Sequence, residues 1–102
     1  MSRTYGTAAA NWWAEKITEE NFGYEPQNID NFKEALADAI NKHMALNAHM
    51  VISTNKKSDN NLLMASVQTK MFAKIPNGYE MGIYGDTGIS VFDDIGLLIF
   101  SA

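Results

Sequence analysis

The sequence predicts a single α+β domain, in which N-terminal helices are followed by a small antiparallel sheet of three to four strands. Amphipathic helical patterns occupy residues 7–20 and 28–47, and short apolar or alternating stretches dominate the last third of the chain. Glycine-rich turns separate these stretches, as is typical of antiparallel strands joined by hairpins. At 102 residues the chain has the length of one domain, and it has no cysteine for a disulfide or a thiolate metal site.

The clearest element is the helix predicted over Asn28–Asn47. Its apolar residues recur at the spacing of one helical face, which we expect to form part of the core. They are Ile29, Phe32, Leu36, Ala39, Ile40 and Met44. We expect Pro26 to precede the helix, Asn28 to cap it and Asp30 to lie in its first turn, where the helix dipole favours an anion.

A first helix is predicted over Thr7–Glu20, with Thr7 as its cap and Gly23 as the left-handed residue beyond its end. Trp12 and Trp13 are adjacent, so on a helix they point about 100° apart. We expect one of them to anchor the core and the other to be partly exposed. An exposed tryptophan is a candidate contact for a partner, and we assign that role to Trp13.

The middle of the chain contains one clear strand and one ambiguous stretch. His49–Ser53 predicts a short strand, and a polar loop with a basic centre follows at residues 55–61. Leu62–Ile75 fits a strand by alternation and a helix by its apolar stripe. Its length favours the helix, since strands average about five or six residues. Asp59 and Asn60, which can cap a helix, lie just before it and favour the same interpretation.

The end of the chain predicts a hairpin and a final apolar segment. Tyr79–Tyr84 and Ile89–Phe92 are expected to pair across the glycine-containing turn at residues 85–88. Ile95–Phe100 is then either a last strand or a patch covered by a partner or a second copy of the chain. The predicted order of elements is therefore α-α-β-α-β-β, with an additional last strand as the alternative.

The charge of the chain is acidic and unevenly distributed. A net charge of −4 argues against direct binding of nucleic acid, because phosphate contacts require Lys and Arg. Residues 15–38 contain seven acids and two lysines, residues 39–74 contain five lysines and one acid, and residues 75–102 contain four acids and no base. This segregation is consistent with an interaction steered by charge toward a basic macromolecule, and equally with chance in a small domain.

Three carboxylates line one edge of the second helix. Asp30, Glu34 and Asp38 are spaced i, i+4 and i+8, an arrangement that costs a few tenths of a kcal/mol per pair, although Lys42 can compensate Asp38. One interpretation is a solvated face, and the other is an acidic edge that meets a basic partner. The candidate partner-binding residues are Trp13, Glu15, Glu19, Glu20, Asp30, Glu34 and Asp38.

The sequence lacks a recognisable catalytic or metal-binding pattern. His43 and His49 match no metal spacing, and the turn at residues 85–88 lacks the lysine and the helix of a phosphate loop. Asp93 and Asp94 are adjacent, so on a strand they would point to opposite sides, and a turn is the favoured interpretation. We therefore expect a protein that is not an enzyme and that holds no cofactor or metal.

Targeting signals are also missing from the pattern. The first residues lack the basic and apolar regions of a signal peptide, and no apolar run reaches the roughly 18 residues of a membrane span. We therefore expect a cytoplasmic protein that does not bind membranes.

The segment Ala8–Ile17, AAANWWAEKI, resembles the opening of small, largely uncharacterised proteins from phages and mobile elements of Firmicutes. The likeness continues through a helix like Leu62–Phe72 into the final strands, and the Trp-Trp step is its specific feature. Members of that group have aromatic residues around the proline where this chain has Ile75 and Asn77, so a shared site is not expected there. The group has no established catalytic residues to transfer.

The resemblance implies a protein directed at the host cell, similar to anti-CRISPR or other anti-defence inhibitors. Our first hypothesis is an inhibitor whose acidic edge occupies the nucleic-acid groove of a host protein such as a CRISPR effector or another nuclease. The alternative is a homo-oligomeric module, such as a homodimer formed through the C-terminal strand, that binds a small ligand or a peptide.

Overall fold

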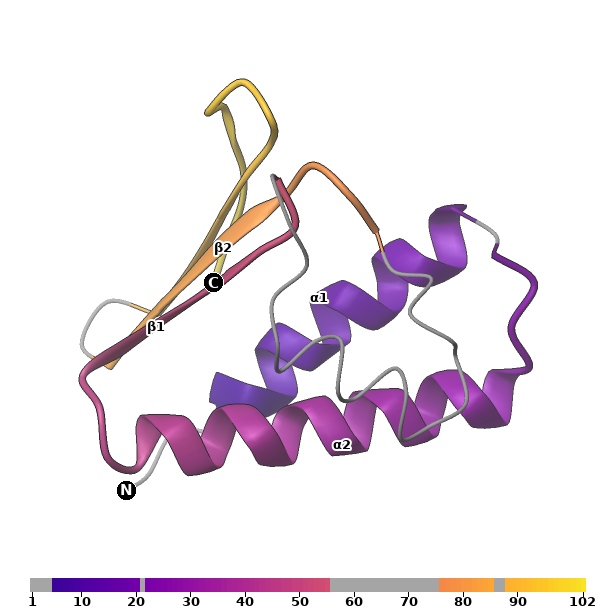
Figure 1. Cartoon of the computed structure of the whole chain (residues 1–102), viewed down its shortest axis with the longest axis horizontal. Coiled ribbons are helices and arrows are strands. Elements are labelled where there is room, and N and C mark those ends of the chain that lie inside the picture. The colour runs from indigo at the N-terminus through magenta and orange to yellow at the C-terminus, as the bar shows by residue number, and fades with distance from the viewer. Residues whose placement is uncertain (1–4, 21, 56–75, 86–87) are drawn as a thin grey trace.

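A computed structural model describes residues 5–20, 22–55, 76–85 and 88–102 of the chain (Figure 1). Two helices lie against one face of an antiparallel sheet with the strand order β1-β2-β3-β4. The elements are α1 (Tyr5–Glu20), α2 (Pro26–Met44), β1 (His49–Ser53), β2 (Glu80–Tyr84), β3 (Gly88–Phe92) and β4 (Leu98–Ser101). The predicted α+β class is confirmed. The helix predicted over residues 62–75 lies outside the described residues.

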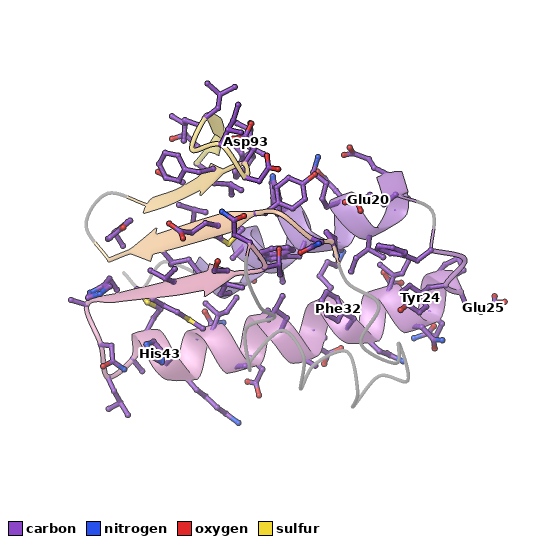
Figure 2. All side chains as sticks on the ribbon, turned by 45° about the horizontal axis from the view of Figure 1, so that its top comes forward. Glu20, Tyr24, Glu25, Phe32, His43 and Asp93 are labelled. Carbon is purple, nitrogen blue, oxygen red and sulfur yellow. The ribbon has the colours of Figure 1, made fainter. Side chains whose placement is uncertain are left out.

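The core lies between the two helices and the inner face of the sheet. From α2 it takes Phe32, Leu36 and Ile40, which have no exposed surface, so the apolar stripe predicted for this helix is confirmed at its centre. Phe32 lies on the side of α2 that faces the sheet (Figure 2). The strands contribute Met50, Ile52, Met81, Ile83, Ile89 and Val91. Alternate residues of each strand thus point toward the helices, as the two-residue period of a strand requires.

Both helices begin earlier than the sequence predicts. The N-cap of α2 is Glu25, in an extended conformation and without a side-chain cap hydrogen bond, and Pro26 is the first helical residue. Proline suits this position because its fixed φ is already helical and its missing N–H has no partner there. The prediction of Asn28 as the cap is therefore wrong, and Asp30 lies beyond the first turn. Thr7 likewise lies inside α1 and does not cap it.

Both tryptophans are buried, so the expectation that one is partly exposed is wrong. Trp13 has an exposed fraction of 0% and Trp12 of 7%. Tyr79 lies just before β2, and its ring centroid is 5.2 Å from that of Trp12 and 6.4 Å from that of Trp13. The ring centroid of Phe100, in β4, is 6.4 Å from that of Trp12. The end of the sheet thus covers the side of Trp12 that would otherwise meet solvent. Trp13 cannot contact a partner from this position.

A last strand, one of the two alternatives for Ile95–Phe100, is present, but it is shorter than the apolar run. β4 begins at Leu98, because the preceding residues form the turn of the β3–β4 hairpin. Asp93 closes this turn: its Oδ1 accepts hydrogen bonds from the backbone N–H of Ile95 (3.1 Å) and of Leu97 (2.8 Å). The turn interpretation of Asp93–Asp94 is therefore confirmed. The register between β3 and β4 shifts between Val91 and Phe92, which makes a bulge in the pairing.

Candidate protein-binding surface

The helices α1 and α2 run antiparallel (Figure 1). A groove between them is lined by residues of both helices. The groove has a volume of about 430 Å³. Its charged residues are Glu15 and Glu19 from α1 and Asp30 and Lys33 from α2, and its uncharged residues are Asn11, Ala14, Thr18 and Ile29. Three carboxylates and one lysine, from two different helices, therefore line the same groove. The mixed apolar and acidic lining suits a basic side chain, whose stem is apolar and whose head is charged.

Among the described residues, one of the three carboxylates in this groove forms an ion pair. Glu19 pairs with Lys16 (Oε1 to Nζ, 3.4 Å), and Lys16 also lies over the ring of Tyr79, with its Nζ 5.3 Å from the ring centroid. The Lys16 side chain is 22% exposed, so the aromatic ring and Glu19 hold it close to the protein. Within the described part of the chain, neither Glu15 nor Asp30 has an ion-pair partner.

The remaining acids of α2 lie on a different flank of the helix. Glu34 and Asp38 line a second hollow, of about 480 Å³, together with Asn31 and Ala35. The reason is geometric: each four-residue step along an α-helix advances about 40° around its axis. The line that starts at Asp30, beside α1, has therefore moved to the other flank by Asp38. An exposed ion pair links Asp38 to Lys42 at 3.2 Å, as predicted.

The structure thus divides the predicted partner-binding residues into several groups. Glu15, Glu19 and Asp30 meet in the groove, Glu34 and Asp38 share the second hollow, and Trp13 is inside the core. Glu20 is exposed at the C-terminal end of α1, outside both hollows (Figure 2). We define the acidic α1–α2 surface as the five residues that line the two hollows. They are Glu15, Glu19, Asp30, Glu34 and Asp38.

Three polar residues of the groove were not among the sequence candidates. Asn11 and Thr18 line it from α1, and Lys33 lines it from α2. Their signal was present in the sequence, since Asn11, Glu15 and Thr18 are spaced i, i+4 and i+7 and therefore share one stripe of α1. In the sequence alone, neutral side chains such as Asn11 and Thr18 on a solvent-facing stripe have no feature that marks them as functional. Their role in the groove depends on the position of α2. The groove forms only where α1 and α2 lie side by side, and the pattern within one helix does not specify that contact.

Comparison with known proteins finds no matching family model, no similar curated protein and no similar solved structure. Neither α1 nor α2, the helices of the described part of the chain, combines the length and the apolar character needed to cross a membrane. Among the described residues, no group of three or more His, Asp and Glu side chains is placed to hold a metal ion.

Proposed function

We propose that this chain is a non-enzymatic inhibitor of a host defence factor, of the anti-CRISPR type, that acts through its acidic α1–α2 surface. The supporting observation is the groove that is lined by Glu15 and Glu19 from α1 and by Asp30 from α2, with Lys33 as the only cation among its lining residues. The origin in a phage or mobile element is supported by the resemblance of Ala8–Ile17 to proteins of such elements.

The proposed partner is a host nuclease, such as a CRISPR effector, whose DNA-binding groove is lined with Lys and Arg. Such grooves attract phosphates mainly through charge. A protein surface with several uncompensated carboxylates competes for the same cations and excludes the nucleic acid without any chemical step. With its net charge of −4, the chain would be attracted to the effector over a distance comparable with the Debye length and repelled by DNA itself. The site of action would be the cytoplasm of the host cell.

The test is a competition experiment with purified host effector nucleases loaded with guide RNA. Binding of target DNA is measured by mobility shift, with and without the chain, at increasing salt concentration. Two charge-reversal variants probe the two halves of the acidic α1–α2 surface. The first combines Glu15→Lys with Asp30→Lys in the groove, and the second combines Glu34→Lys with Asp38→Lys in the second hollow. We expect inhibition by the wild-type chain to weaken with salt, and both variants to lose it.

The control variant combines Glu80→Lys and Asp94→Lys. It changes the net charge by the same amount as each test variant, but both residues are exposed elsewhere: Glu80 on β2 and Asp94 in the β3–β4 turn. We expect it to inhibit like the wild-type chain. Equal inhibition by all three variants would show that total charge, or another surface, is responsible, and would overturn the proposal. So would the failure of the wild-type chain to inhibit any effector of its host.

The alternative hypothesis, a homo-oligomeric module for a small ligand or a peptide, stays a prediction. Its ligand has no support from the described residues, where the groove between α1 and α2 is open and acidic. This alternative also requires a contact between two copies of the chain, and that contact does not depend on whether a ligand binds.

A further inference from the structure

The β3–β4 hairpin carries most of the exposed large apolar side chains in the described part of the chain. The exposed fraction is 83% for Ile95, 60% for Leu97, 52% for Leu98 and 41% for Ile99. Figure 1 shows the hairpin, in yellow, projecting from the sheet on the side away from α2. It is therefore separate from the acidic α1–α2 surface.

Within the described part of the chain, the outer edge of β4 is not paired with another strand. In the described sheet β4 is the last strand, paired with β3 alone. Ile89 and Ala102 exchange two backbone hydrogen bonds of 2.9 Å each. In an antiparallel ladder, a residue adjacent to such a hydrogen-bonded pair directs its N–H and C=O away from the partner strand. Ser101 therefore points both groups away from β3, where a further strand could pair with them.

The charge pattern identifies a second copy of the chain as the partner that suits this edge. Residues 95–102 contain no charged side chain, whereas the chain as a whole has a net charge of −4. Two copies of an acidic protein repel one another, and an uncharged edge is where they can meet without placing carboxylates together. Natural edge strands avoid association through a lysine, a proline, an inward-pointing charge or a β-bulge. Of these features β4 has only a bulge, which lies at Ile99, near the end of the strand that follows the β3–β4 turn.

The exposed area is sufficient for a weak dimer. The four apolar side chains leave a patch on the order of 500 Å² per copy, in the range of patches that are often functional. Two such patches can bury at most on the order of 1,000 Å² together, which is the lower limit for a specific interface and fits a weak contact. An antiparallel contact between two identical edges is also self-complementary under two-fold symmetry, so it closes at two copies.

We propose that two copies of this chain form a dimer in which their β4 strands pair antiparallel and the apolar residues of the two hairpins pack together. The dimer joins two four-stranded sheets and leaves the acidic α1–α2 surface of each copy open. The proposal does not depend on the proposed inhibition of a host nuclease.

The test is the molar mass of the full chain in solution, measured by light scattering and sedimentation from micromolar to near-millimolar concentration. We expect the mass to rise from one chain toward two. Leu98→Lys places a charge in the contact and should weaken dimerisation by about tenfold or more. Leu46→Lys is the matched control, because Leu46 is 87% exposed in the segment between α2 and β1, and it should leave dimerisation unchanged.

Ser101→Pro tests the strand pairing itself. It removes an N–H that β3 does not use, so the β3–β4 ladder should remain while the dimer is lost. Circular dichroism checks the fold of each variant, and Ile95→Lys replaces Leu98→Lys if the latter fails to fold. A wild-type chain that stays monomeric throughout would overturn the proposal. A dimer that persists in Leu98→Lys or Ser101→Pro, or masses above two chains, would overturn the paired β4 geometry.

Discussion

The backbone N–H of Gly6 in α1 donates a hydrogen bond of 3.0 Å to the side-chain Oδ1 of Asn41 in α2. Gly6 is the second residue of α1, and the described residues of this helix offer its N–H no acceptor four residues earlier. Asn41 therefore acts as a cap supplied by a different helix. The contact joins the start of α1 to the last turns of α2, at the end of the helix pair opposite the connecting loop.

Gly6→Ala should destabilise the protein. A Cβ at this position would meet the backbone carbonyl oxygen of Ala37 and, at 2.7 Å, the Oδ1 of Asn41. The carbonyl oxygen cannot move unless α2 moves with it. We expect a loss of about 1–3 kcal/mol in the free energy of unfolding, despite the gain of up to about 1 kcal/mol in helix propensity. Urea denaturation measures the change. Thr7→Ala, at an exposed neighbouring position of α1, is the control and should stay within about 0.5 kcal/mol of the wild type.

Asn41 provides a second, chemically distinct prediction. Asn41→Ala removes the acceptor for the Gly6 N–H and should lower the free energy of unfolding by about 0.5–1.5 kcal/mol. Asn41→Asp keeps an acceptor oxygen for the Gly6 N–H. Its negative charge is favoured by the dipole at the N-terminus of α1 and disfavoured by the dipole at the C-terminus of α2, so the two effects oppose each other. Because the hydrogen bond is retained, Asn41→Asp should be more stable than Asn41→Ala in the same urea titration. Equal stability of the two variants would show that the retained acceptor and its charge bring no net gain over alanine.

The sequence predicts this fold well where a local pattern carries the information. The stripe of α2 and the bounds of β1, His49–Ser53, are correct because they depend on periodicity within one element. Gly23 was also predicted correctly as left-handed, with a φ of +83°. The exposure of Trp12 was not predictable, since Tyr79 and Phe100, which cover it, are distant in sequence.

Thr54 joins the end of β1 to the residue before β2 and should be sensitive to substitution. Its side chain is buried, with an exposed fraction of 2%. The Tyr79 N–H donates to the Thr54 Oγ1 at 3.2 Å, and the Thr54 N–H donates to the Tyr79 carbonyl oxygen at 2.7 Å. Thr54→Val keeps the shape but leaves the N–H of Tyr79 without that acceptor, which should cost about 1–3 kcal/mol.

The matched control for this position is Thr54→Ser. It retains the hydroxyl and loses only a methyl group, so it should be less destabilising than Thr54→Val in thermal or urea unfolding. If Thr54→Val is the more stable of the two, packing of the methyl group outweighs the hydrogen bond.

The candidate surface was only partly predictable, for a reason that concerns helix docking. Five of the seven candidate residues line the two hollows, but the three on α2, which the sequence placed on a single edge, are divided between them. Which flank of α2 faces α1 depends on the contact between the helices. Gly6 permits that close contact, and nothing in the sequence pattern singles it out. Asp30 therefore joins Glu15 and Glu19 across the groove, whereas Asp38 does not.

Substitution of Glu34 tests whether the carboxylates along α2 contribute to the stability of the fold or to binding of a partner. Asp30 and Asp38 lie one turn before and after it, so Glu34 has a like charge on both sides, and Lys42 pairs with Asp38 alone. Like charges at i, i+4 are destabilising, and opposite charges at this spacing are stabilising, by a few tenths of a kcal/mol per pair. Glu34→Lys should therefore raise the free energy of unfolding, and Glu34→Gln should raise it by a smaller amount.

The same Glu34→Lys substitution should weaken the inhibition that we propose, because it removes a carboxylate from the acidic α1–α2 surface. A more stable protein that binds less well is expected where a surface is retained for function at a small cost in stability. Urea denaturation and the mobility-shift competition, run on the same preparations of wild type, Glu34→Gln and Glu34→Lys, measure both effects. If Glu34→Lys is more stable and inhibits as well as the wild type, Glu34 belongs to a solvated face and not to the contact.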